Sequence, residues 1–240
     1  MANKDKHPEF GKKQIDPLRD CVILAFDPGE TTGWCVIGAD VVGLTMTSLD
    51  YGQIDCASQD LSGWFGTAHK HAGLNMAGEN IGIAHMVDMA ARKYPLSAIV
   101  IEDFIPDMKR MDQARHTLSP VRITAGFSYG LSVASAGSSA SSDSRVFIQN
   151  RSLAKTTCTD DRLKNWGLYD RKSGPHARDA VRHAYYFLRD CRGNSPESAL
   201  KRHMAWPHFF NDPNSIDDDR SSRGSAFRKS VKQKKLGEII

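Results

Sequence analysis

The sequence has no apolar run long enough to cross a bilayer, no paired cysteine motif and no strong excess of either charge. Crossing a membrane takes roughly 20 consecutive apolar residues, and the opening segment MANKDKHPEF is polar where a signal peptide would be apolar. The five cysteines are odd in number and widely separated, which argues against a disulfide framework or a zinc site. These absences predict a soluble, cytoplasmic protein with reduced thiols and no membrane partner.

The bulk composition is that of an ordinary globular protein. Of the 240 residues, 40% are hydrophobic and 25% are charged, which suits one domain with room for an appendage. The net charge of +4 favours polyanionic partners only weakly, so the distribution of the charges matters more than their sum. Residues 1–20 are polar and lysine-rich, and residues 191–240 are polar with a basic end. We predict a flexible basic arm, a folded domain over 21–190 and a disordered tail.

Apolar periodicity predicts the elements of that domain. Three strands open it as an antiparallel meander, and later strands alternate with helices, which requires parallel pairing. We therefore expect an α/β fold whose mixed five-stranded sheet is flanked by helices, with loops at 54–74 and 135–144. The expected strands are 21–26, 34–38, 41–52, 97–104 and 145–150, and the expected helices are 75–93, 119–134, 159–167 and 176–190.

Acidic residues stand where a sheet-based site would need them. Asp27 ends the first expected strand, Glu102 and Asp103 end the fourth, and Asp179 lies near the start of the last expected helix. Ligands of helix-covered sheets commonly lie at strand ends, so these carboxylates can converge there. Carboxylates that converge repel one another unless a cation lies among them. Oxygen ligands of this kind suit Mg²⁺ or Mn²⁺, the ions that assist phosphodiester hydrolysis.

The last expected helix carries three polar residues on one face. His176, Asp179 and His183 are three and four residues apart, so they project within about 60° of one another. The same spacing places the three arginines of this helix on roughly the opposite side, away from a metal ligand. Those arginines are Arg178, Arg182 and Arg189.

Each of these residues also has a purely structural interpretation. Asp27 precedes a Pro-Gly pair, which is common turn chemistry, and the acidic pair of the fourth strand can be a solvated strand end. Asp179 near a helix start can favour the helix dipole by about 0.3 to 1 kcal/mol. His183 lies nearer the apolar stripe and is interpreted as a packing residue. Convergence of the acids in space is what distinguishes a site from these interpretations.

Three segments together resemble the acidic motifs of a nuclease family. They are 22-VILAFDPGETTGWCVIG-38, 98-AIVIEDF-104 and 176-HARDAVRHAYYFL-188. In order and placement they resemble the RuvC-like Holliday junction resolvases of the ribonuclease H-like superfamily. Two further segments, 119-SPVRITAGFSYGL-131 and 155-KTTCTDDRLKNWGLYD-170, resemble the resolvases encoded by bacteriophages of actinobacteria. The resemblance runs from about Cys21 to Asp190.

The resemblance implies a role for each matching residue. Asp27, Glu102 and Asp179 match the three carboxylate metal ligands of the family. His176 occupies a position where family members carry Asp or His, and it is expected to orient or ligate the metal. Lys155 matches a lysine that the family places near the scissile phosphate. Whether Asp103, the next residue, shares the role of Glu102 stays open.

The resemblance also implies a ribonuclease H-like fold, a homodimer, and Mg²⁺-dependent paired nicking of four-way DNA junctions, with Mn²⁺ able to substitute. A phage-encoded protein of this kind would act in the cytoplasm of the bacterial host, in recombination, replication or packaging. A two-fold dimer presents two equivalent sites, which suits a nearly symmetric junction. The candidate DNA-contacting residues are Thr31, Thr32, Arg115, Arg122, Lys155, Arg162 and Lys164.

Three other functions remain open from the sequence. A nuclease on the same scaffold that acts on flaps, forks or RNA:DNA hybrids would use the same carboxylates. An ATP-binding domain of the actin and sugar-kinase type also carries an acid, glycines and threonines in its first hairpin, but this chain lacks the second phosphate loop. A protein that binds junctions without cutting them would be expected to have lost one of the acids.

Overall fold

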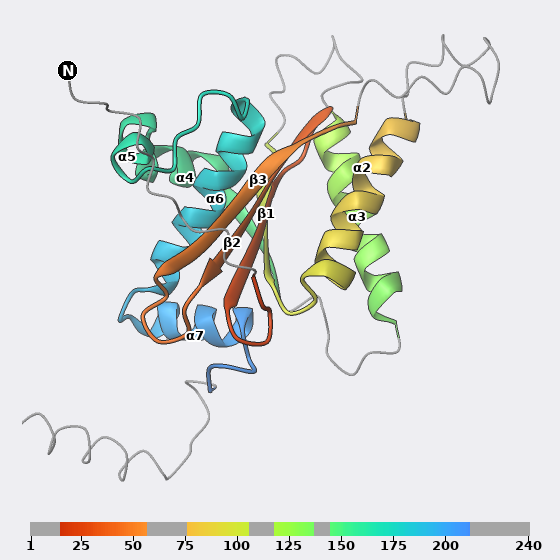
Figure 1. Cartoon of the computed structure of the whole chain (residues 1–240). Helices are drawn as coiled ribbons and strands as arrows, with labels where there is room; N and C mark the ends of the chain where they lie inside the picture. Colours follow the sequence, from red (N-terminus) through yellow and green to blue (C-terminus); the bar gives the residue numbers. More distant parts are fainter. Residues whose placement is uncertain (1–14, 57–75, 106–117, 137–144, 212–240) are drawn as a thin grey trace, which may run out of the picture.

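The computed structural model describes residues 15–56, 76–105, 118–136 and 145–211. A central sheet lies between two layers of helices, with α2 and α3 on one face and α4 to α7 on the other (Figure 1). The sheet has five strands in the order β3-β2-β1-β4-β5. In this part of the chain, each helix is too short or too polar to traverse a bilayer.

The first three strands form the predicted antiparallel meander. Strand β1 (Cys21–Asp27) pairs with β2 (Thr31–Ala39), which pairs in turn with β3 (Met46–Asp55). All residues of β1 are buried, as its unbroken apolar run predicts for a central strand. Strand β3 begins later and ends later than predicted. Its start is delayed because the side chain of Asp40 accepts backbone hydrogen bonds across residues 41–45 and holds a turn there.

The remaining two strands pair in parallel. Strand β4 (Ala98–Asp103) lies beside β1, and β5 (Val146–Asn150) lies beside β4. An antiparallel meander that is extended by two parallel strands, in the order 3-2-1-4-5, is the sheet of the ribonuclease H-like fold. The predicted fold class is therefore confirmed. The carboxyl ends of β1, β4 and β5 lie at the same edge of the sheet.

One layer consists of two packed helices. Helix α2 (Met76–Asp88) widens at its end into a π-helical turn, η2 (Met89–Lys93), and α3 (Ser119–Ser135) packs beside it. The apolar stripe of α3 faces the sheet. Gly126 and Gly130 face α2 instead, since a Cβ on either would meet Ile83 or Val87 at 2.5 or 2.8 Å. The small residues of α3 thus allow α2 to pack closely.

The other layer carries four helices. The short helices α4 (Arg151–Thr157) and α5 (Asp160–Asn165) follow β5, and the long helix α6 (Pro175–Cys191) crosses the sheet. Thr159 caps α5 as its sequence predicts, by accepting a hydrogen bond from the backbone of Arg162. Helix α4 was not predicted, because seven residues that follow a strand directly carry little periodicity.

The packed structure continues past the predicted end of the domain. Helix α7 (Pro196–Ala205) lies in the segment that was expected to be disordered. Trp206, directly after it, is fully buried against Phe187, and its indole Nε1 donates to the carbonyl of Val22 at 3.0 Å. The expectation of a tail from residue 191 is thus wrong as far as residue 211. Residues 1–14 of the predicted arm and 212–240 of the predicted tail lie outside the described residues.

Candidate functional site

The register of the sheet places Asp27 and Glu102 side by side. Asp27 is the last residue of β1, and Glu102 lies at the end of the neighbouring β4. Because Ala25 pairs with Val100 in the parallel ladder, the residues two positions further on each strand point to the same face. That face is the one covered by α6. Both carboxylates are buried there.

Asp103 is separated from this pair by the alternation of the strand. Successive side chains of β4 point to opposite faces, so Asp103 points to the face that α2 and α3 cover. The described residues that can together hold a metal ion include Glu102 and do not include Asp103. Of the two candidate acids at this strand end, Glu102 is the one that belongs to the cluster.

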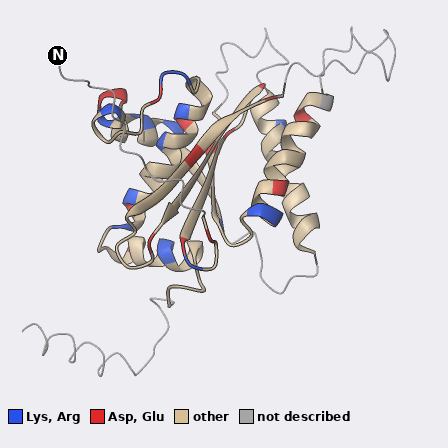
Figure 2. Cartoon of the chain, in the orientation of Figure 1, with Lys and Arg blue, Asp and Glu red and all other residues tan. Residues whose placement is uncertain are grey.

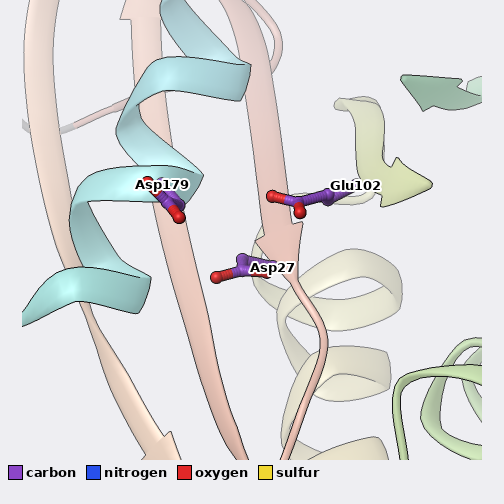
Figure 3. A group of neighbouring side chains, drawn as sticks. All are labelled: Asp27, Glu102 and Asp179. Carbon is purple, nitrogen blue, oxygen red and sulfur yellow. The ribbon is translucent and has the colours of Figure 1, made fainter. Parts of the chain in front are cut away.

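Asp179 of α6 completes a cluster of three buried carboxylates. One oxygen from each of Asp27, Glu102 and Asp179 lies within 4.8 Å of the others. Figure 3 shows the three side chains pointing toward one another from two strands and a helix. The predicted convergence is present, and the cluster has the oxygen donors and the closeness that a divalent cation requires.

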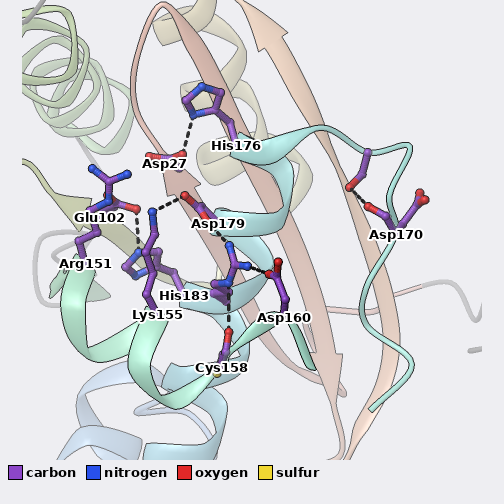
Figure 4. Close-up of polar contacts among 12 residues, drawn as sticks. Asp27, Glu102, Arg151, Lys155, Cys158, Asp160, Asp170, His176, Asp179 and His183 are labelled. Atoms are coloured by element: carbon purple, nitrogen blue, oxygen red, sulfur yellow. Dashed lines mark hydrogen bonds and ion pairs between the residues drawn. The ribbon is translucent and has the colours of Figure 1, made fainter. Parts of the chain in front are cut away.

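One face of helix α6 carries one carboxylate of the cluster and two histidines that contact the other two carboxylates. It supplies Asp179 itself, and His176, three residues earlier, lies with Nδ1 2.8 Å from Asp27 Oδ2. His183, four residues later, lies with Nε2 2.9 Å from Glu102 Oε2. These contacts are drawn in Figure 4. His183 was interpreted as a packing residue, and it is indeed fully buried, but it also contacts a member of the cluster.

Basic side chains contact both oxygens of Asp179. Lys155 Nζ lies 2.6 Å from Asp179 Oδ2, so its side chain is at the cluster. Arg182 donates to the other oxygen of Asp179, and it also contacts Asp160 and the carbonyl of Cys158. Arg182 was expected to project away from the metal ligand, and that expectation is wrong. Residues three apart are neighbours on a helix surface, so its long side chain reaches Asp179.

Charge and burial act on these groups in different directions. Burial raises the pKa of Asp27, the hydrogen bond to His176 opposes the rise, and the other two carboxylates add to it. The hydrogen bond to Asp27 raises the pKa of His176. Burial also disfavours ionisation of Asp179, but Lys155 and Arg182 outweigh it and lower its pKa. The charged form of Asp27 is therefore less stabilised than that of Asp179.

Three residues of the site were missed by sequence reasoning. Arg151 Nε lies 3.2 Å from Glu102 Oε1, Gln149 Oε1 lies 2.6 Å from His183 Nδ1, and Asp160 contacts Arg182. Arg151 and Lys155 are four residues apart, so they share one face of α4. The four-residue spacing of these two basic residues, directly after β5, could have indicated that both face the site, but only if helix α4 had been predicted.

The predicted DNA-contacting residues lie in different surroundings. Thr32 is fully buried and its hydroxyl bonds to Gly29 within the hairpin turn, so the structure gives it a role in the turn. Arg122 forms a two-bond ion pair with Glu79 on the far helical layer. Thr31 is half-buried at the start of β2, and Arg115 lies outside the described residues.

Arg162 and Lys164 are exposed on α5, on the same side of the sheet as the carboxylate cluster. Figure 2 shows Lys and Arg gathered over α4, α5 and α6. From residue 151 to residue 190 the chain carries nine Lys and Arg against five Asp, with no Glu. The helical layer that covers the cluster is therefore basic around an acidic centre.

Comparisons with known proteins show a likeness in fold. No protein-family model and no curated protein matches the chain. Among solved structures, RuvC of Thermus thermophilus in complex with a Holliday junction substrate matches with a TM-score of 0.45 and 14% identity, over 73% of this chain and 98% of that chain. Another structure of Thermus thermophilus RuvC gives a TM-score of 0.42 and 13% identity, over 70% and 95%. A likeness this distant says nothing about the substrate of this chain.

Proposed function

We propose that this protein is a metal-dependent, structure-selective DNA endonuclease that resolves four-way junctions by paired nicking. The observation that carries the proposal is the convergence of Asp27, Glu102 and Asp179, with one oxygen of each within 4.8 Å of the others. Three buried carboxylates at that separation repel one another strongly, and a fold retains such an arrangement most readily where a cation occupies it. Phosphodiester hydrolysis is the chemistry that such a centre serves best.

The donor set fits Mg²⁺, with Mn²⁺ as a substitute. All three ligands are carboxylates, and hard oxygen donors suit these two ions better than they suit zinc or copper. His176 lies against Asp27 and orients it, or adds a ligand on that side. One or two ions held there would activate a water molecule and stabilise the oxygen that leaves phosphorus.

The surrounding residues have separate tasks in this mechanism. Lys155 lies at the border of the cluster, where its ammonium group can offset the charge that builds on the phosphate oxygens in the transition state. Arg182 holds Asp179 against α5 and so fixes the direction of that ligand. Water attacks in line, and cleavage leaves a 5′-phosphate and a 3′-hydroxyl.

DNA is the proposed polyanion because the basic layer surrounds the cluster. Arg162 and Lys164 on α5 are exposed there and can contact phosphates without reading sequence. Two such sites in a homodimer would face two strands of a nearly symmetric junction. The phage-encoded type of resolvase remains a prediction from the sequence motifs, and so do the arm over residues 1–14 and the tail over residues 212–240, which lie outside the described residues.

A nicking assay tests the proposal. Wild-type protein, Asp27→Asn and Asp179→Asn are incubated with Mg²⁺ and a four-way junction, a flap, a fork or an RNA:DNA hybrid. We expect wild type to cut the junction preferentially, at two symmetric positions, and both variants to lose cutting while they retain junction binding. Asp88→Asn on α2 is the matched control and should cut normally, since α2 covers the opposite face of the sheet and the Asp88 side chain pairs with Arg92.

Other outcomes would favour the alternative functions. Preferential cutting of flaps or hybrids would identify the protein as a nuclease of another class with the same fold. Junction binding without any cutting would identify a binding protein, and ATP hydrolysis without DNA would revive the ATP-binding alternative. Full cutting by Asp27→Asn would refute the assignment of the centre itself.

A further inference from the structure

His183 is a fully buried imidazole that contacts the cluster on one side and the sheet on the other. Its Nε2 lies 2.9 Å from Glu102 Oε2, and its Nδ1 lies 2.6 Å from Gln149 Oε1. Gln149 and Glu102 are partners in the parallel ladder of β5 and β4. The ring therefore joins α6 to the ends of two neighbouring strands (Figure 4).

The two oxygens of Glu102 have different partners. Oε2 is bonded to His183, which has no solvent exposure and therefore little freedom to move. Oε1 is paired with Arg151 at 3.2 Å, and that side chain is 60% exposed. An exposed arginine can move into solvent at little cost, because exposed ion pairs contribute only about 0 to 1 kcal/mol. Oε1 is thus the oxygen that is free to accept a new partner.

Gln149 fixes the imidazole in turn. If the amide of Gln149 is rotated by half a turn, its NH₂ group donates to Nδ1, and the neutral ring then carries its proton on Nε2 and donates it to Glu102. Filling the space between α6 and the sheet alone would not require an imidazole, because an apolar side chain would pack there without the cost of burying two ring nitrogens. The contacts with Gln149 and Glu102 are therefore the feature of His183 that an apolar side chain could not provide.

We propose that His183 is a positioning residue: it holds Glu102 Oε2 and thereby presents Oε1 to the divalent cation. This inference rests on the proposed metal-dependent function, and it concerns metal affinity, not contact with DNA. Outer-shell partners of metal ligands typically change metal affinity about 10- to 100-fold when they are removed. His183→Leu should weaken cation binding to that extent, and His183→Gln, whose amide can donate to Glu102, should restore most of it.

The test measures binding of Mn²⁺ to the protein alone, by the electron paramagnetic resonance signal of the free ion, in the absence of DNA. Junction binding without metal and thermal unfolding are measured in parallel. We expect His183→Leu to bind Mn²⁺ at least about 10-fold more weakly, with unchanged junction binding and a cooperative unfolding transition. The recovery in His183→Gln separates positioning from packing, because both variants lose the shape of the ring.

Two results would overturn the inference: Mn²⁺ binding by folded His183→Leu that equals wild type, or equal weakening in His183→Leu and His183→Gln. If His183→Leu does not fold, Gln149→Leu decides, because it removes the anchor of the ring without touching Glu102. Unchanged Mn²⁺ affinity in that variant would refute the positioning role, and weakened affinity would support it. Wild type that binds Mn²⁺ and cuts no DNA would refute the proposed function while leaving this inference standing.

Discussion

Gly33 of β2 lies directly against the first turn of α6 at His176. A Cβ atom at Gly33 would stand 2.0 Å from the carbonyl oxygen of His176, closer than any side chain can approach. Gly33 also pairs with Asp27 in the antiparallel ladder. The absence of a side chain at this one position thus lets the helix that carries Asp179 approach the strand that carries Asp27.

Gly33→Ala should therefore disturb stability and site together. Forcing a methyl group into a closely packed contact costs about 1 to 3 kcal/mol in the free energy of unfolding, which urea denaturation measures. Because the clash is with backbone of α6, we also expect weaker Mn²⁺ binding. Gly29→Ala is the control, since its Cβ would meet only the carbonyl of Thr31, at 3.5 Å. Equal stability of the two variants would show that α6 tolerates displacement.

Lys155→Ala should slow nicking more than it weakens DNA binding. A group that stabilises charge in the transition state contributes about 10²- to 10³-fold to the rate, whereas one phosphate contact among several contributes little to affinity. Single-turnover nicking rates and junction affinities separate the two effects. Lys93→Ala, an exposed lysine on the opposite helical layer, should change neither. A loss of affinity without loss of rate would reduce Lys155 to a simple phosphate contact.

The ion pair between Glu79 and Arg122 should stabilise the α2 and α3 layer. Two hydrogen bonds of 2.8 and 2.6 Å join a buried carboxylate to the guanidinium group, so Glu79→Gln should cost about 1 to 3 kcal/mol of unfolding free energy. Asp88→Asn is the control in the same layer. Its pair with Arg92 is exposed, so its loss should cost about 0 to 1 kcal/mol.

The contribution of Glu79 should depend on pH. Burial acts to raise the pKa of Glu79, but the hydrogen bond and charge of Arg122, together with the Ser119 hydroxyl, outweigh it and hold the pKa below its ordinary value of 4.5. A carboxyl group whose pKa is lowered by folding stabilises the protein above its unfolded pKa, and that stability is lost as pH falls through the folded pKa. The difference between wild type and Glu79→Gln should therefore shrink below pH 4.5. A difference that stays constant down to full protonation would contradict the pairing.

Trp206 should anchor the segment that was expected to be a disordered tail. Truncating a fully buried tryptophan costs about 3 to 5 kcal/mol, so Trp206→Ala should lower the unfolding free energy by that amount. Leu200→Ala on the more exposed side of α7 should change stability by no more than about 0.5 kcal/mol. If Trp206→Ala were as stable as wild type, the residues beyond 190 would not contribute to the stability of the folded domain.

The sequence by itself determined the sheet and the acids of the site. The apolar run of β1, the Pro-Gly turn after Asp27 and the helical period of α6 are local patterns, and each is set by neighbours a few residues away. Strand alternation would also have placed Glu102 and Asp103 on opposite faces, but which face lies toward α6 depends on packing. The convergence of acids from three segments could thus be predicted from the sequence, whereas the choice between Glu102 and Asp103 could not.

Only the tertiary structure decided which side chains surround the carboxylates. His183 contacts Glu102 across 81 positions of sequence, and Trp206 reaches Val22 across 184. Helical spacing makes Arg182 a neighbour of Asp179, but the contact of Arg182 with Asp160 of α5 depends on how α5 packs against α6. Partners of this kind come from segments whose distance in space is fixed by packing of the whole core, so no local pattern of residues carries that information.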